Sequence, residues 1–369
     1  TLVVDRRLLR ENVATLKGHV QDRFDYRIVA KSLPSLPLLQ NVMEAYGSHR
    51  LMLFHQPFIN QVAAHFPHTD ILLGKPMPVN AAGNFYRQFE EGDFEPSSQL
   101  RWLLDTPARA SEYAQLAQDL NQRMLACIEI DVGLHRCGCR PDDPAFLELA
   151  KTIQQHPRLQ FVGLLSHAGH AYGAADRSAV AAIAEDERRI MLAVARRLED
   201  AGVPVQEISV GATPTVLAAT RFDGITEIRP GNYVFMDQTP LRLGLVTLEQ
   251  VALTVMTTVI SRNPDFLIVD AGSKTFSSDL GAHGSGRGTG FGIGWPRGCF
   301  GNDEKALTLV RLSEEHGFIT RSNNDLDMGA RVRFIPNHAC PVANLARTLV
   351  VVEGDNVYEW PVDARGRVR

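Results

Sequence analysis

Short apolar runs alternate with amphipathic stretches through residues 1–235. Eight of these runs have the length of β-strands, and several end in a polar residue or glycine; they cover residues 27–31, 51–55, 71–74, 101–105, 125–131, 160–166, 207–210 and 226–229. Continuous apolar runs are typical of parallel strands that are buried on both faces. The runs and the stretches between them predict right-handed βαβ units that close into a (β/α)₈ barrel.

The stretches between the runs have the periodicity of amphipathic helices. They cover residues 36–46, 58–65, 108–120, 145–155 and 175–201. The last of them is followed by Gly202 and Pro204, which are residue types that commonly end a helix. Short strands that alternate with helices place this part of the chain in the α/β class.

The pattern changes after Tyr233, where strand-like runs follow one another with little helix between them. These runs cover residues 251–260, 265–270, 306–312, 330–335 and 348–352. The opening residues 2–5 are also strand-like, and we expect them to pair with this second region. The prediction is therefore a barrel domain over residues 6–235 and a mainly β domain formed by residues 1–5 and 236–369.

Length and composition agree with two domains and exclude several classes of protein. The chain has 369 residues, whereas a single barrel has about 250. Its content of 44% hydrophobic and 22% charged residues, with a net charge of −4, is ordinary for a globular protein and lacks the basic excess of a nucleic-acid binder. Apolar runs shorter than a membrane span and the absence of a signal-peptide pattern predict no membrane association and a cytoplasmic location.

The five cysteines are an odd number in a large chain, which argues against a framework of disulfides and favours free thiols or a metal ligand. A second compositional feature is the segment 281–298, which contains eight glycines. A phosphate cradle is one interpretation, but no Gly-Lys-Ser/Thr sequence follows the glycines. We therefore expect a loop that lies over a site.

Lys31 directly follows the apolar residues Ile28, Val29 and Ala30. A lysine at a strand end is often a solvated surface charge, but the mouth of a barrel is also where a carbonyl-reactive amine would lie. Two glycine turns, 209–215 and 229–233, follow the last two predicted strands, where barrel enzymes commonly bind phosphate. Together with Lys31, these turns suggest an enzyme that uses pyridoxal 5'-phosphate (PLP).

Motifs along nearly the whole chain resemble the D-threonine aldolase and D-serine dehydratase family. They are Lys31, residues 129–138, residues 167–170, the two glycine turns, residues 269–275 and residues 336–341. The resemblance implies an alanine-racemase-like enzyme of PLP fold type III, with a PLP-binding barrel and a β domain that carries a metal site. It also implies a small-molecule D-amino acid substrate and a homodimer.

Carried over residue by residue, the resemblance makes Lys31 the lysine that holds PLP through a Schiff base. The expected cofactor-binding set is Lys31, Arg136, Tyr172, Gly211, Thr213, Thr215, Gly231, Asn232 and Tyr233. In this set the hydroxyls of the two threonines would donate hydrogen bonds to the phosphate, and the glycines would let the backbone approach it. Arg136 would lie near the pyridine ring or its phenolate oxygen, although a charge on the barrel rim is an equally good interpretation. The sequence Lys31-Ser32-Leu33 departs from the Lys-Thr-His of many members, which leaves the substrate less defined than the cofactor.

His338 and Cys340 are separated by one residue, so on an extended strand their side chains would share a face and reach the same cation. An imidazole with a thiolate favours zinc, while manganese and magnesium are also possible. Taken alone, a His-x-Cys sequence is more often a plain strand pair. The resemblance favours the metal site, and in the family His-x-Asp is typical of aldolases and His-x-Cys of dehydratases.

The resemblance implies two reactions on a D-3-hydroxy amino acid. Loss of the hydroxyl proton leads to cleavage of Cα–Cβ, and loss of hydroxide leads to dehydration. His167 and His170 are the candidate proton carriers. Residues 270–275 and 360–362 look closer to the aldolases, so retro-aldol cleavage is favoured slightly over dehydration. Two hypotheses of a different kind are a metal-independent amino-acid racemase and a non-catalytic PLP carrier.

Overall fold

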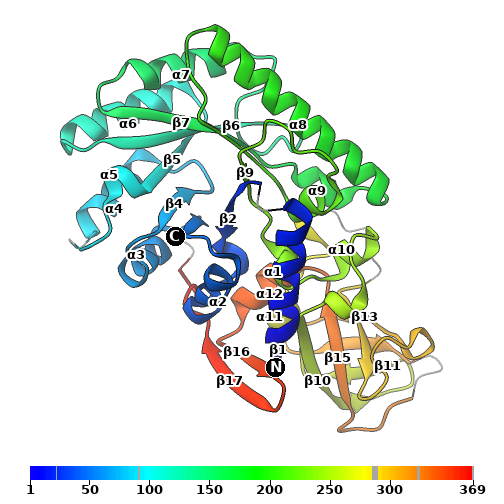
Figure 1. The fold of residues 1–369 in the computed structure, drawn as a ribbon. Helices are drawn as coiled ribbons and strands as arrows, with labels where there is room; N and C mark the ends of the chain where they lie inside the picture. The colour runs from blue at the N-terminus through cyan, green and yellow to red at the C-terminus, as the bar shows by residue number, and fades with distance from the viewer. Residues whose placement is uncertain (22, 90–91, 285–289, 322–324, 368–369) are drawn as a thin grey trace.

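The chain folds into a barrel and a second, mainly β domain, as the sequence predicts (Figure 1). The computed structural model describes residues 1–21, 23–89, 92–284, 290–321 and 325–367. In these residues a closed parallel barrel contains strands β2 to β9 in chain order. They are β2 (Asp25–Val29), β3 (Arg50–Leu53), β4 (Asp70–Leu73), β5 (Leu100–Leu104), β6 (Met124–Ile130), β7 (Leu159–Ser166), β8 (Glu207–Val210) and β9 (Glu227–Ile228).

Helices surround the barrel and connect its strands (Figure 1). The α-helices of the barrel region are α1 (Arg6–Val20), α2 (Leu36–Tyr46), α3 (Gln56–His65), α4 (Val79–Gln88), α5 (Pro96–Gln99), α6 (Pro107–Asp119), α7 (Ala145–Gln155), α8 (Arg177–Asp200), α9 (Thr213–Ala218) and α10 (Gln238–Arg242). Three short 3₁₀ turns also matter for the site: η1 (Ala30–Ser32), η2 (Gly169–Gly173) and η3 (Asn232–Val234). Helices α2 and α7 have the bounds that the sequence predicts, whereas α4 was not expected.

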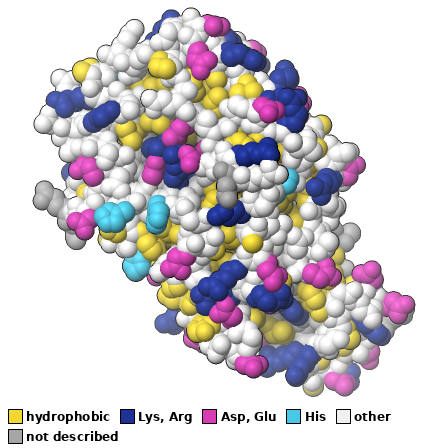
Figure 2. Space-filling model, viewed as in Figure 1, with side chains coloured by type: hydrophobic (Ala, Val, Ile, Leu, Met, Phe, Trp, Pro, Cys, Tyr) yellow, Lys and Arg dark blue, Asp and Glu magenta, His cyan; other side chains and the backbone are white. Residues whose placement is uncertain are grey.

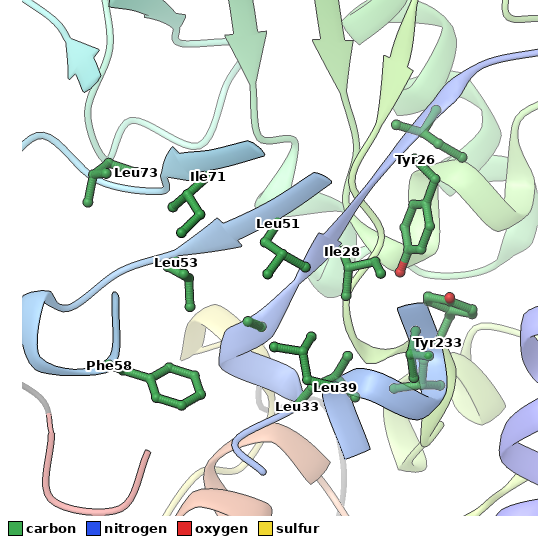
Figure 3. Packing of buried hydrophobic residues seen from close by; sticks show 14 of the residues in the cluster. Tyr26, Ile28, Leu33, Leu39, Leu51, Leu53, Phe58, Ile71, Leu73 and Tyr233 are labelled. Carbon is green, nitrogen blue, oxygen red and sulfur yellow. The ribbon is translucent and has the colours of Figure 1, made fainter. Parts of the chain in front are cut away.

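Along each barrel strand, successive side chains point alternately into the barrel interior and toward the surrounding helices. Figure 3 shows Ile28, Leu51 and Ile71 on neighbouring strands, with Leu39 of α2 packed beneath them. The intervening residues, such as Val29 and Met52, form a separate buried cluster inside the barrel. Both faces are thus apolar, which explains why these strands appear in the sequence as continuous apolar runs.

A buried layer of ion pairs closes the barrel at the N-terminal ends of its strands. Arg27 is fully buried and donates through Nε to Glu227 Oε1 at 2.9 Å and through Nη1 to Asp70 Oδ1 at 2.8 Å. Arg101 bridges Asp70 and Glu207 in the same layer. Burial on its own raises the pKa of Glu227, but the Arg27 charge outweighs it and lowers that pKa to about 2. The charged layer therefore lies opposite the end of the barrel that holds Lys31.

The second domain is a nine-stranded sheet over the described residues, in the order β11-β14-β13-β12-β15-β10-β1-β16-β17. Its strands are β1 (Leu2–Asp5), β10 (Leu253–Arg262), β11 (Phe266–Val269), β12 (Gly292–Pro296), β13 (Leu307–Leu312), β14 (Gly317–Thr320), β15 (Arg331–Pro336), β16 (Thr348–Glu353) and β17 (Asn356–Pro361). Strand β11 also pairs with β10, so one part of the sheet closes on itself. The N-terminal strand β1 runs antiparallel to β10 and parallel to β16, and thereby joins the first residues of the chain to this domain.

Part of the glycine-rich segment differs from the expected loop. Residues 292–296 form β12, which pairs with β13 and β15. Glycine is required there because a Cβ on Gly294 would lie 2.5 Å from the ring of Phe334. Residues 285–289 of the predicted loop lie outside the described residues. Among the residues that the structure does describe, no helix combines the length and the apolar character needed to cross a membrane.

Candidate active site

Lys31 lies just beyond the C-terminal end of β2, in the short turn η1. The side chain is accessible to water and lines a cavity, and its amine lies 5.1 Å from the ring centroid of Phe54. Loss of hydration lowers the pKa of the Lys31 amine, and the charges of Arg136 and Arg229 lower it further, whereas Cys340 acts in the opposite direction. The amine is therefore more nucleophilic near neutral pH than a surface lysine.

The cavity beside Lys31 has a volume of about 150 Å³ and is formed by both domains. The barrel supplies side chains from the C-terminal ends of its strands, as expected for a barrel enzyme. The sequence-predicted residues that line it are Lys31, Arg136, His167, Tyr172, Thr213, Gly231, Asn232, His338 and Cys340. The structure thus brings together groups that are distant in the sequence.

The two glycine turns face each other in the cavity wall. Thr213 is the first residue of α9, and its Oγ1 accepts a hydrogen bond from Gly231 N at 3.2 Å. A Cβ on Gly231 would lie 2.8 Å from Ser32 Oγ, so only glycine leaves this turn close to the lysine segment. Asn232, the next residue, also lines the cavity. The backbone N–H groups at the start of α9 and of η3 make this wall suited to an anion.

Three predicted cofactor residues lie near the cavity but do not line it. The backbone carbonyl of Gly211 accepts a hydrogen bond from His167 Nδ1 at 3.1 Å. The hydroxyl of Thr215 bonds to the backbone of Ala212 and so closes the first turn of α9. Tyr233 is fully buried and packs edge-on against Tyr26 in the core. These residues support the cavity wall through its backbone.

Arg136 and Arg229 place two positive charges at the cavity. Arg136 Nη2 lies 3.4 Å from Glu129 Oε1, and both residues line the cavity. Arg229 is buried; its Nε donates to Ser209 Oγ at 2.8 Å, and its Nη2 donates to Ser166 O. The sequence placed Arg229 in the second glycine turn but indicated no role for its side chain. Its position at the end of the eighth strand was the signal that could have identified it.

His167 and His283 form a pair at the mouth of the cavity. Their Nε2 atoms are 3.1 Å apart, and His283 also lies against Tyr172 with ring centroids 5.4 Å apart. Since a carbonyl only accepts, His167 Nδ1 carries the hydrogen that bonds to Gly211 O. His167 Nε2 is then an acceptor, and His283 Nε2 is its donor.

Both rings of this pair are uncharged near neutral pH. Burial places the pKa of His167 well below its usual value, and burial together with the Lys31 charge lowers that of His283 to about 4. His283 was not singled out from the sequence because it lies within the glycine-rich segment, at a left-handed backbone position with φ 56°. By contrast, His170 points away from the cavity, where its ring packs against Gly133.

His338 and Cys340 do not lie on an extended strand, so this part of the prediction was wrong. Strand β15 ends at Pro336, His338 is the N-cap residue of α12 (Ala339–Leu345), and Cys340 is the second residue of that helix. The strand ends there because Asn337 turns the chain and donates to Leu280 O and Gly290 O. Both side chains nevertheless line the cavity beside Lys31.

The two residues have partners that orient them. His338 Nδ1 lies 2.9 Å from Asp279 Oδ2, which directs Nε2 away from that carboxylate, and Cys340 Sγ lies 3.1 Å from Ser32 Oγ. Burial lowers the pKa of His338, but its hydrogen bonds to Asp279 and Cys340 outweigh burial and raise it to about 10. Within the described parts of the chain, no cluster of three or more His, Cys, Asp or Glu side chains is arranged to hold a metal ion. A cation here would have two protein ligands and open positions for other donors.

Comparisons with known proteins agree with this arrangement. Residues 4–239 match the alanine racemase N-terminal domain, and residues 252–352 match the putative serine dehydratase domain. The chain is similar to D-threo-3-hydroxyaspartate dehydratase from Delftia sp., with 35% identity over 65% of this chain and 66% of that protein. The solved structure of that protein has a TM-score of 0.85 and 28% identity, and the match covers 98% of this chain and 96% of that one.

Two further relatives are named for other activities. A D-serine dehydratase from Dictyostelium discoideum is 28% identical over 78% of this chain and 75% of its own length. A D-threonine aldolase from Arthrobacter sp. is 29% identical over 74% of this chain and 70% of its own length. The two domain matches together extend over both domains of the fold. The chain therefore belongs to the D-threonine aldolase and D-serine dehydratase family of alanine-racemase-like proteins.

Proposed function

We propose that this protein is a PLP-dependent lyase that acts on D-3-hydroxy amino acids with the help of a divalent metal. The observation that carries the proposal is that the Lys31 amine and the His338–Cys340 pair line one cavity although they come from different domains. A substrate in that cavity would present Cα to the lysine and the 3-hydroxyl to the imidazole and thiolate. The chain belongs to a PLP-dependent family of fold type III, and its relatives are lyases by name.

The residues of the cavity fit PLP. Lys31 provides an amine with a lowered pKa, as a carbonyl-reactive lysine requires. The turns at Thr213 and Gly231 provide backbone N–H groups for a phosphate, and Gly231 leaves no room for a side chain. Arg229, which is held by Ser209 and Ser166, provides a fixed cation in the cavity wall for the ring.

The pair His338–Cys340 fits a divalent cation, and zinc is the metal that we propose. The hydrogen bond from Nδ1 to Asp279 makes Nε2 the nitrogen that would bind a metal, which would displace the proton that the raised pKa of His338 retains there; a second-nitrogen bond to a carboxylate is typical of metal-binding histidines. In the Delftia relative, solved structures include variants of a histidine and of a cysteine that are two positions apart, and the cysteine variant is described as metal-free. The same spacing separates His338 from Cys340.

The side chains of this protein would bind, orient and move protons around the substrate. Bound PLP would supply delocalisation of the electron pair left at Cα, and a bound cation would supply Lewis acidity near Cβ. Lys31 Nζ is the base or acid at Cα, because it lines the cavity and its lowered pKa favours the uncharged amine more than in a surface lysine. His167 Nε2 is a second acceptor in the cavity, and its Nδ1–H is fixed by Gly211 O.

We favour dehydration as the reaction, with retro-aldol cleavage as the second candidate. Elimination removes a proton from Cα and hydroxide from Cβ, and hydrolysis then gives a 2-oxo acid and ammonia. The sequence favoured cleavage slightly. We now prefer dehydration, because His338 and Cys340 have the same spacing as the histidine and cysteine that were varied in the Delftia dehydratase. Cleavage remains a candidate because the D-threonine aldolase of Arthrobacter, at 29% identity, is about as similar to this chain as the D-serine dehydratase of Dictyostelium, at 28%.

Product analysis with D-threonine tests the proposal. Elimination gives 2-oxobutanoate and ammonia, whereas cleavage gives glycine and acetaldehyde. Either pair of products, lost on chelation and restored by zinc, supports a metal-dependent lyase. Loss of chirality without either pair, and unaffected by chelation, would instead identify the protein as a racemase. A cytoplasmic location and a homodimer are further parts of this proposal, which fractionation and sedimentation would test.

A further inference from the structure

A second cavity adjoins the first on the side of β3. Its volume is about 310 Å³, which is larger than the cavity that surrounds Lys31. Four residues line both cavities: Lys31, Phe54, His338 and Cys340. The second cavity therefore begins at the same amine, imidazole and cysteine sulfur to which we assign the chemistry.

The wall beyond these shared residues is mainly apolar. It is formed by Leu53 and Phe58 from the barrel side and by Pro341 and Ala364 from the second domain. Leu53 and Phe58, two of these lining residues, are labelled in Figure 3, and Ala364 of the C-terminal segment lines the same cavity. A cavity with this lining binds an apolar group through the hydrophobic effect.

Each of three polar side chains in the wall makes at least one contact within the protein. Asn344 Nδ2 donates to Lys31 O at 2.9 Å and to Cys340 O at 3.0 Å. His55 Nδ1 lies 3.3 Å from Lys75 Nζ, and Arg367 Nε donates to Asp363 O at 2.9 Å. The apolar side chains are therefore the main surface that the cavity offers to a ligand, with the guanidinium of Arg367 as a charged group in the same wall.

The proposed position of the substrate determines which of its groups would lie in the second cavity. With Cα at Lys31 and the 3-oxygen at His338 and Cys340, the remaining substituent of Cβ starts where the two cavities meet. We propose that the second cavity receives this substituent, and that the preferred substrates carry an apolar group there with the size of a branched alkyl chain or an aromatic ring. This inference rests on the proposed function and adds the substrate class to it.

The size and polarity of the cavity set the expected discrimination. Serine, threonine and 3-hydroxyaspartate, for which the relatives are named, carry hydrogen, methyl and carboxylate at this position. The first two leave most of the cavity unfilled, and a carboxylate loses hydration against a wall that is mainly apolar and offers it Arg367 as the single arginine of the lining. An aromatic ring fills the space and gains from burial.

Phe54 is one of the residues that line both cavities. Its ring packs directly on Gly74, where an added Cβ would lie 2.3 Å from Cε1 of the ring. A side chain at position 74 would force the ring of Phe54 to move. Gly74→Ala therefore displaces a ring that lines both cavities and that also lies beside the Lys31 amine.

The experiment compares kcat/KM of the holoenzyme for D-serine, D-3-hydroxyaspartate and D-3-phenylserine, with both diastereomers of the last. We expect phenylserine to exceed the other two by at least about tenfold, a discrimination within reach of an apolar pocket. A preference for D-serine or D-3-hydroxyaspartate would overturn the inference and leave the proposed function intact. Absence of lyase products from all three substrates would overturn the proposed function itself.

Two substitutions test the location of the pocket. Ala364→Phe fills the second cavity, so the ratio of kcat/KM for phenylserine to that for D-serine should fall at least about tenfold. Ala14→Phe is the matched control, since Ala14 is exposed on α1, and this ratio should not change. If the Ala364→Phe protein does not fold, as judged by thermal unfolding, Ala364→Leu replaces it. An unchanged ratio in a folded variant of Ala364 would overturn the assignment.

Discussion

The carboxylate of Asp279 lies 2.9 Å from Nδ1 of His338, although 59 positions separate the two residues in the sequence. The residue before His338 makes a second connection to the same loop, because Asn337 Nδ2 donates to Leu280 O at 3.2 Å and to Gly290 O at 2.8 Å. The segment that would hold the metal is thus fixed against the loop that carries Asp279. His338 then keeps one ring orientation, with Nε2 on the side opposite the carboxylate.

Asp279 should therefore act as a positioning residue for the metal. We expect Asp279→Ala to weaken metal binding by about 10- to 100-fold, since the ring loses the partner that fixes its orientation and tautomer. Chelator competition on the purified protein measures this without relying on turnover. Asp355→Ala, an exposed position in a turn, is the control and should keep the affinity of the unmodified protein. Equal metal affinity in the two variants would show that Asp279 does not position His338.

The sequence was sufficient for the barrel because its signal is local. Each barrel strand is buried on both faces, so runs such as 125–131 in the sequence correspond closely to strands such as β6. The strands of the second domain were harder to predict from the sequence. Strands β12, β14 and β17 were not predicted, and β17 is largely exposed, so neither an apolar run nor a clear alternation identifies it.

Part of the candidate site could be predicted from the sequence, because some of its residues follow closely after barrel strands. Lys31, His167 and Gly231 come just after barrel strands, and strand ends meet at one face of a barrel. His283 and Asp279 follow no strand in this way, and only the folding of a distant loop brings them to His167 and His338. No local pattern encodes such a contact.

Lys31 should be the residue that anchors the cofactor. We expect the purified protein to show an absorbance band near the edge of the visible range and expect Lys31→Ala to lose it, because no amine remains at that point of the cavity. Lys274→Ala is the matched control, since Lys274 lies on the surface between Glu314 and Glu315. A band that is unchanged in Lys31→Ala would exclude this lysine as the anchor.

His167 rather than His170 should carry protons in the reaction. His167 lines the cavity and has an acceptor nitrogen there, whereas His170 packs on Gly133 outside it. We expect His167→Gln to lower kcat by about 10²- to 10⁴-fold, the usual contribution of general acid–base catalysis, while the cofactor band is kept. His170→Gln serves as the comparison and should change kcat much less. The reverse order of effects would assign the proton transfer to His170.

Glu227 should stabilise the fold in a way that depends on pH. Its folded pKa of about 2 lies below the ordinary value of 4.5, because Arg27 favours the ionised form. The stabilisation is therefore complete above about pH 4.5 and is lost as the pH falls toward 2.

Removing one partner of this buried pair leaves the other charge uncompensated, so Glu227→Gln should lower the free energy of unfolding by about 3–5 kcal/mol at pH 7. Urea unfolding at a series of pH values should show this difference shrinking below pH 4.5. Glu112→Gln, an exposed position on α6, should show no such difference. A deficit in Glu227→Gln that stays constant down to pH 2.5 would mean that lost packing, and not the ion pair with Arg27, accounts for the destabilisation.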